Sequence, residues 1–258
     1  MSGSIAVPYV GDTLGRKRLS RLLSPYFRLR AWTRGSDTCG RTGEPLVVAS
    51  LTADFDREMA VVSGLGWRNP ALHAVLVVPD RRVRARLEHM GNRSRLRPLL
   101  VNQDPDRFLA EFHSTWFLAE SARLECSTYT SQLPEVLLGA LRVVVRSRLD
   151  APPHTVADVA DGVGVSRGYL SRTAAAHDVS LPDLTRTWLS LLAMDRRLST
   201  HEPWDRVARR AGYASASGLT RLFRAHHGFE PSRCGREEFH GAVIRFRDRV
   251  LGVLERSA

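Results

Sequence analysis

The chain has 258 residues, enough for two ordinary domains, and its 43% hydrophobic and 25% charged residues are typical of a globular protein rather than a disordered one. The 38 Lys+Arg outnumber the 27 Asp+Glu, which gives a formal net charge of +11, and Lys17 is the only lysine. A surface rich in arginine favours nucleic acid as a partner, although a genome rich in G and C would produce the same bias.

The cysteines and the apolar runs exclude several other classes. Cys39, Cys126 and Cys234 lie far apart and form no CxxC pair, so we expect a reducing compartment with neither a zinc site nor a disulfide framework. The segment Met1 to Val10 lacks the pattern of a signal peptide. No apolar run approaches the roughly 20 residues that cross a bilayer. We therefore expect a soluble, cytoplasmic protein with no membrane partner.

Strands and helices alternate in the first half of the chain. Residues 1–43 show no clear periodicity, and their basic run from Arg16 to Arg21 suits a solvated face. Strands are expected over Leu46–Leu51, Leu72–Val78 and Arg97–Val101. Helices are expected over Asp54–Leu65, Asp80–His89 and Asp104–Phe112. This alternation predicts an α/β domain over residues 44–113, with a short parallel sheet and flanking helices.

The second half of the chain is expected to be helical. Residues 114–153 form a predicted helical connector that ends at Pro152-Pro153, the best domain boundary in the chain. Residues 154–236 form a predicted all-α domain, and residues 237–258 add a C-terminal amphipathic helix. The connector carries an apolar stripe made of Leu137, Leu138, Leu141, Val144 and Val145.

Two segments of the all-α domain carry the pattern of a helix-turn-helix. Such a unit needs a small residue where its helices cross and a glycine that can adopt positive φ in the turn. Ala160 and Gly164 have this spacing, and Ser166 stands where an N-cap would open the second helix. The pattern returns at Ala208 and Gly212, followed by Ser215 and Ser217 as alternative caps. One match arises often by chance, but two in tandem indicate a pair of helix-turn-helix units.

The segment from Thr155 to Arg236 resembles the AraC/XylS family of transcription regulators. The resemblance is carried by Val159-Ala160, Gly164-Val165-Ser166, Tyr169-Leu170-Ser171-Arg172, Val207-Ala208, Gly212-Tyr213, Leu219-Thr220-Arg221-Leu222-Phe223-Arg224 and Gly228-Phe229-Glu230-Pro231-Ser232. It implies a long connecting helix, here Leu184 to Leu198, between two units whose second helices enter adjacent major grooves. The first unit is the less regular copy, because Ala174 stands where Phe is usual and Asp178 where glycine is usual.

The resemblance also implies a role for individual residues. Groove-facing side chains that would contact bases are Ser171, Arg172, Ser217, Thr220 and Arg221. Two further groove-facing positions, Gly168 and Ala216, offer only apolar contact. Arginines expected to contact phosphate are Arg167, Arg209 and Arg224. The residues that form the scaffold of the two turns are Ala160, Gly164, Ala208 and Gly212.

Residues 44–113 resemble the degenerate receiver-like domains that some members of this family carry. A working phosphoreceiver needs an acidic pair after the first strand, an Asp at the tip of a later strand and a lysine beyond it. Thr52-Ala53-Asp54 lacks the pair, and no lysine follows Asp80. Because phosphoryl transfer needs Mg²⁺ and a compensating cation, we expect a module that is inert to phosphate and serves dimerisation or partner contact.

The sequence therefore predicts a DNA-binding transcription regulator and not an enzyme. No Ser-His-Asp or Cys-His set has a persuasive spacing, and adjacent His226 and His227 suit a surface better than a metal site, so we expect no catalytic residue, cofactor or metal. The expected partners are double-stranded DNA, RNA polymerase and a second copy of the chain. The homodimer would form through the apolar stripe, although such stripes are more often buried within their own domain.

Two other functions stay open at this point. The helical domain is alternatively a protein-interaction module that has lost base reading, because its first unit is irregular and few groove-facing residues are polar. An enzyme that uses the α/β half is a third hypothesis, since such sheets host many activities. The absence of a glycine-rich turn between a strand and a helix argues against it.

Overall fold

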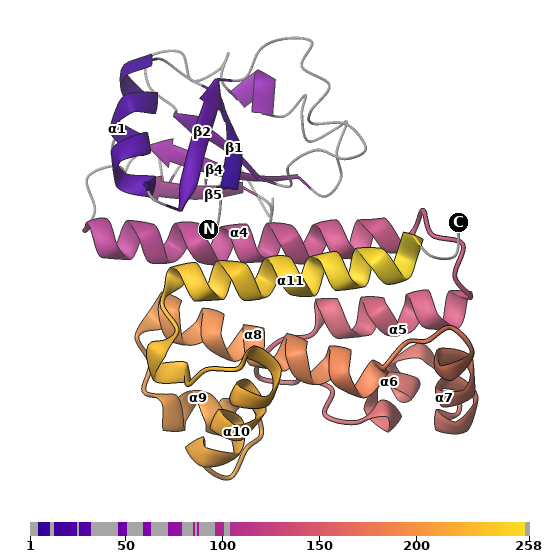
Figure 1. Cartoon of the computed structure of the whole chain (residues 1–258). Coiled ribbons are helices and arrows are strands. Elements are labelled where there is room, and N and C mark those ends of the chain that lie inside the picture. Colours follow the sequence, from indigo (N-terminus) through magenta and orange to yellow (C-terminus); the bar gives the residue numbers. More distant parts are fainter. Residues whose placement is uncertain are drawn as a thin grey trace. The chain divides into compact units, whose positions relative to one another are not determined.

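The protein consists of an α/β N-terminal part and a helical C-terminal part, which is the fold class that the sequence predicts (Figure 1). The computed structural model describes residues 5–10, 13–24, 26–31, 46–50, 59–62, 72–78, 85, 87, 96–100 and 104–255. The chain divides into two compact units, Met1–Arg123 and Leu124–Ala258. Within the described ranges, no helix is both long enough and apolar enough to span a membrane.

The first unit is built on a five-stranded sheet with the order β2-β1-β3-β4-β5, in which all neighbouring strands are parallel. The strands are β1 (Ile5–Val10), β2 (Phe27–Ala31), β3 (Leu46–Ser50), β4 (His73–Val78) and β5 (Leu96–Leu100). In the central strand β3, Val48 lies between Tyr9 of β1 and Val75 of β4. Strands β3 and β4 are buried along their whole length, which explains why every residue in them except Ser50 and His73 is apolar.

Part of this sheet comes from residues 1–43, where the sequence shows no clear periodicity. Strand β1, helix α1 (Thr13–Leu23) and strand β2 all lie there. The sequence signal is weak because α1 buries Leu19 and Leu23 beneath a basic exposed face, and β2 is a short edge strand that exposes Arg28 and Arg30.

The two additional strands, β1 and β2, change which strand is compared with the first strand of a phosphoreceiver. Leu46–Ser50 is the third strand and not the first, so an acidic pair after the first strand would have to follow Val10, where the sequence has Gly11-Asp12. The strand order is that of flavodoxin-like sheets, which bind ligands where the order reverses between β1 and β3. Residues 11–12, 51–58 and 79–84, including Asp54 and Asp80, lie outside the described residues. Inertness to phosphate therefore stays a prediction.

Helix α4 (Pro105–Thr128) is one continuous helix where the sequence suggests a boundary near Phe112. It begins after Asp104, whose carboxylate accepts a hydrogen bond from the Arg107 amide at 3.0 Å. The Phe27 ring of β2 packs against Phe112 and Trp116, with centroids 4.8 Å and 6.1 Å apart. These two aromatic residues lie one turn apart on α4, so one buried face runs through the predicted boundary.

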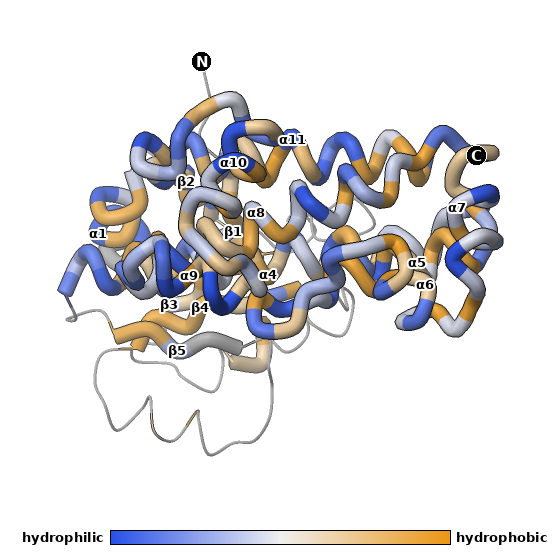
Figure 2. The backbone as a smooth tube through the Cα atoms, turned by 90° about the horizontal axis from the view of Figure 1, so that it is seen from below, coloured by the Kyte–Doolittle hydropathy of each residue, from blue (hydrophilic) through white to orange (hydrophobic). Residues whose placement is uncertain are grey.

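The second unit is helical. It contains α5 (Glu135–Arg146), α6 (Val156–Val163), α7 (Arg167–Ala176), α8 (Leu181–Thr200), α9 (Trp204–Arg210), α10 (Ala216–His227), the 3₁₀ helix η2 (Pro231–Arg233) and α11 (Arg236–Glu255). Helix α8 is its centre, because it contacts α5, α9, α10 and α11. The Trp188 ring of α8 packs on Phe246 of α11, with centroids 5.2 Å apart. Hydrophobic and hydrophilic residues alternate along these helices, as expected for amphipathic helices (Figure 2).

Helix α5 belongs to this unit and is not a connector outside it. It packs against α6, α7 and α8, and the five residues of its apolar stripe are each 5% exposed or less. The proposed dimer contact through this stripe therefore loses the observation that motivated it. Pro152-Pro153 lies in the loop between α5 and α6, inside the compact unit that begins at Leu124.

The position of α5 leads to a prediction about fragments. We expect residues 124–258 to fold alone as a cooperative helical unit. A fragment that starts at Pro153 should lose on the order of 5 kcal/mol of stability, because its remaining helices lose the apolar contacts of α5. Circular dichroism with thermal melting of both fragments is the measurement. Equal melting temperatures would show that α5 is dispensable.

Candidate nucleic-acid interface

The first helix-turn-helix consists of α6 and α7. Helix α6 begins in a capping box, in which Thr155 Oγ1 accepts from the Asp158 amide and the Asp158 carboxylate accepts from the Thr155 amide. Backbone hydrogen bonds from His154 and Thr155 lower the pKa of Asp158. The helix ends at Gly164, whose φ of +77° lies in the left-handed region. The Val165 amide then donates to the Ala160 carbonyl at 3.0 Å, closing the turn in a Schellman motif.

The second helix-turn-helix, α9 and α10, closes in the same way. Gly212 also has a φ of +77°, and the Tyr213 amide donates to the Ala208 carbonyl at 2.9 Å. Ala160 and Ala208 are 1% and 0% exposed, respectively. The repeated spacing in the sequence thus has one cause, because the small residue supplies the buried carbonyl and the glycine supplies the left-handed turn.

The two second helices begin differently. Ser166 caps α7, and its hydroxyl accepts from the Tyr169 amide at 3.2 Å. Ser215 stands at the N-cap of α10, but its hydroxyl pairs with that of Ser217 at 2.8 Å instead of accepting from a backbone amide. Figure 1 shows the two helix-turn-helix pairs at opposite ends of α8.

Asp178 follows α7, at the position where the family resemblance expects glycine. Asp178 takes the left-handed conformation there, with a φ of 58°. The amide of Val179 donates to the Ala174 carbonyl at 2.9 Å, so this is a third Schellman closure. Aspartate tolerates this conformation better than most residues but is less suited to it than glycine.

A buried carboxylate joins the end of α8 to α9. The side chain of Glu202 is 7% exposed and accepts from Arg196 Nε at 2.8 Å and Arg210 Nε at 3.0 Å. Arg210 also pairs with Asp150 at 3.2 Å. Hydrogen bonds from Arg196, then Arg210, lower the pKa of Glu202. No motif in the sequence marks Glu202 as a functional residue. Its only sequence signal is that it is one acidic residue among several arginines, next to Pro203.

Two histidines fasten α10 to α8. Thr187 and Ser190 donate their hydroxyl protons to backbone carbonyls, so their oxygens accept from the rings. His226 Nδ1 therefore donates to Thr187 Oγ1 at 3.1 Å, and His227 Nε2 donates to Ser190 Oγ at 2.7 Å. The expectation that this pair lies on the surface is wrong, because the α8–α10 packing half-buries both rings. In the ranges that the structure describes, no group of three or more His, Cys, Asp or Glu residues is placed to hold a metal.

The side chains predicted to contact bases fall into two groups. Ser171, Arg172, Ser217 and Arg221 are exposed, whereas Thr220 is half-buried. Ser217 is engaged with Ser215, and the Thr220 oxygen accepts from the Trp204 indole. The buried residues Leu170 and Ala174 of α7, and Leu219 and Phe223 of α10, fix which face of each helix points outward.

The arginines of the two units differ in their pairing. Arg209 pairs with Asp205 at 2.9 Å, and Arg224 pairs with Glu230. Arg167, Arg172 and Arg221 form no hydrogen bond or ion pair with any residue that the structure describes. Two of the three arginines expected to meet phosphate are therefore held by carboxylates, whereas both arginines expected to meet bases are free of such partners.

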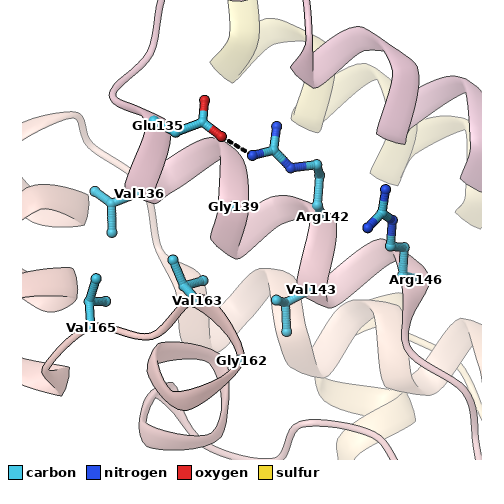
Figure 3. Close-up of a pocket in the computed structure, with 9 residues that line it drawn as sticks. All are labelled: Glu135, Val136, Gly139, Arg142, Val143, Arg146, Gly162, Val163 and Val165. Atoms are coloured by element: carbon cyan, nitrogen blue, oxygen red, sulfur yellow. Dashed lines mark hydrogen bonds and ion pairs between the residues drawn. The ribbon is translucent and has the colours of Figure 1, made fainter.

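A pocket of about 470 Å³ lies between α5 and α6 (Figure 3). Its valines come from both helices and the following turn, while Glu135, Arg142 and Arg146 lie along one side of it. Arg142 pairs with Glu135, and Arg146 pairs with Glu125 and donates to the Tyr129 hydroxyl at 3.0 Å. Because both guanidinium groups are already neutralised, the pocket offers no uncompensated charge to a ligand.

Two glycines at this pocket allow the first helix-turn-helix to pack closely on α5. A Cβ atom at Gly139 would lie 3.1 Å from a Val163 methyl group, and one at Gly162 would lie 3.1 Å from both methyl groups of Val143. The pocket is thus the rim of a tight helix contact that sets the position of α6.

Comparison with protein-family models, curated proteins and solved structures finds no match to this chain. The function of the protein is therefore inferred from the geometry of the helical unit.

The left-handed turns lead to two substitutions of opposite effect. Gly164→Ala should cost about 1 kcal/mol of unfolding free energy, because the new Cβ meets nothing within 4 Å and the cost is conformational alone. Asp178→Gly should add about 0.5–1 kcal/mol, since it relieves the same strain and removes a negative charge from a helix C-terminus. Urea unfolding measures both. Asp178→Ala keeps the strain and separates the two causes, and a loss of stability in Asp178→Gly would contradict this account.

The buried histidines lead to a prediction about acid. Burial lowers the pKa of His227 from 6.5 to about 4 and that of His240 to about 3. The folded unit therefore favours the neutral rings, so their contribution is complete above pH 6.5 and is lost as the pH falls towards 4. We expect the melting temperature to fall over this range and His227→Gln to flatten the fall, with the exposed His177→Gln as control. A melting temperature that is constant over this range would contradict the prediction.

Proposed function

We propose that the helical unit binds double-stranded DNA sequence-specifically and that the protein regulates transcription. Helices α7 and α10 would each enter a major groove, which is wide enough to admit an α-helix. The observation that carries the proposal is that Arg167, Arg172 and Arg221, on these two helices, have no partner among the described residues. An exposed arginine without a carboxylate partner retains its full capacity for phosphate or base oxygens.

The outward faces of both helices have the spacing that groove reading requires. Ser171 and Arg172 follow Gly168 by three and four positions, so the three lie on one face of α7. Thr220 and Arg221 have the same relation to Ser217 on α10. Because most of the other side chains on these faces are small or already hydrogen-bonded, Arg172 and Arg221 would carry most of the base recognition, each to a guanine.

The net charge of +11 supports the same function. Basic side chains that neutralise phosphates release counterions, which makes the affinity fall with salt and supplies the part of binding that ignores sequence. Arg209 and Arg224 would contribute to this part only by leaving Asp205 and Glu230. We therefore expect them to matter less than Arg167. RNA polymerase as a further partner stays a prediction of the resemblance.

The test begins with selection of binding sites by the full chain from a pool of random duplexes. The selected site should contain two guanines about one helical turn apart, one for each groove. Arg172→Ala and Arg221→Ala should each weaken binding to that site by about 1–3 kcal/mol in fluorescence anisotropy and relax the preference at one base pair.

The control is Arg209→Ala, which removes the same charge from a paired, exposed arginine. Arg209→Ala should weaken binding slightly, by the same factor for every DNA sequence, and leave the base preferences unchanged. Selection without any enriched sequence, or binding that is indifferent to salt, would contradict the proposal and favour the protein-interaction module.

A further inference from the structure

Trp204 touches the base-reading face of α10 from outside that helix. It is the first residue of α9, and its half-buried ring joins three helices. The Arg197 guanidinium of α8 lies 5.8 Å from the ring centroid, and the Phe223 ring of α10 lies edge-on at 6.2 Å. The indole Nε1 donates a hydrogen bond to Thr220 Oγ1 at 2.9 Å. The ring therefore has contacts with both α8 and α10, and its N–H group donates to a hydroxyl that is expected to face the groove.

This hydrogen bond sets the direction in which the Thr220 hydroxyl can act. An indole N–H can only donate, so the Thr220 oxygen must accept. Four threonines on other helices donate their proton to the carbonyl four residues earlier, namely Thr115, Thr173, Thr187 and Thr200, at distances of 2.8, 3.0, 2.7 and 2.6 Å. No described residue accepts the proton of Thr220.

The position of Thr220 on α10 makes the proton of its hydroxyl group available to a hydrogen-bond acceptor outside the protein. Thr220 is adjacent to Arg221, and Ser217 lies three positions before it on the same face. Leu219 and Phe223 are buried on the inner side of the helix. A hydroxyl whose oxygen already accepts a hydrogen bond is also a stronger donor, since hydrogen bonds in a chain polarise one another.

We propose that Trp204 is a positioning residue that makes Thr220 a hydrogen-bond donor to an acceptor atom on a base edge in the major groove. The acceptors available there are purine N7, guanine O6 and thymine O4. The inference rests on the proposed DNA binding and adds the chemical class of contact made beside Arg221.

The experiment compares Trp204→Phe, Thr220→Val and the double variant of the full chain on the selected site. Trp204→Phe keeps an aromatic ring against Arg197 and Phe223 and removes the N–H donor together with the rest of the pyrrole ring. Each single variant should weaken binding by about fivefold and relax the preference at the same base pair. The double variant should bind about as well as either single variant, because both remove one coupled contact. Thr220→Ser, which retains the hydroxyl group, should keep the base-pair preference of the unmodified chain.

The controls separate positioning from folding and from loss of DNA binding altogether. A merely structural role for Trp204 would lower the melting temperature and weaken binding to every sequence alike, and that result would overturn the proposal. Additive losses in the double variant, or an unchanged base preference in Thr220→Val, would overturn it too. If Arg221→Ala still weakens specific binding in those cases, only this inference fails. If the unmodified chain selects no sequence, the proposed function itself fails.

Discussion

One backbone contact sets the geometry of the helical unit. In each helix-turn-helix, the amide that follows a left-handed glycine donates to the carbonyl of a buried alanine, Ala160 or Ala208. The contact requires a residue that adopts positive φ at low cost and a small residue where the helices cross. Once it forms, the direction of the second helix is fixed, and so is the face that Leu170 or Leu219 buries. The exposure of the arginines on α7 and α10 is a consequence of this turn.

Helix α8 makes the two turns parts of one structure. It packs against α5 at the first unit and against α9 and α10 at the second, with Trp188 in its core. Polar contacts add orientation to this apolar packing, since Glu202 fastens α9 and the histidine pair fastens the end of α10. At neutral pH, the two histidine rings are uncharged and the Glu202 carboxylate is paired with arginine. The position of α10 therefore depends on protonation states that acid would change.

The pairing of charges separates arginines that the sequence treats alike. Arg209 and Arg224 appear in the sequence as exposed basic residues, just as Arg172 and Arg221 do. Carboxylates of Asp205 and Glu230 hold the first two, whereas the last two have no partner among the described residues. Asp205 lies one helical turn from Arg209 and could have been found from the sequence. Glu230 follows α10 beyond Gly228, so its contact with Arg224 depends on how the chain turns there.

Local signals predicted the α/β and all-α halves, the strands β3 and β4, and the spacing of both turns, because buried strands and left-handed glycines have recognisable sequence patterns. Long-range packing, which leaves no such signal, places β1 and β2 in the sheet, makes α5 part of the helical unit and brings Trp204 to Thr220. The reason is physical. The sequence around an edge strand, an apolar stripe or a single polar side chain does not indicate which element it will pack against. That element is determined by contacts between residues that are distant in the chain.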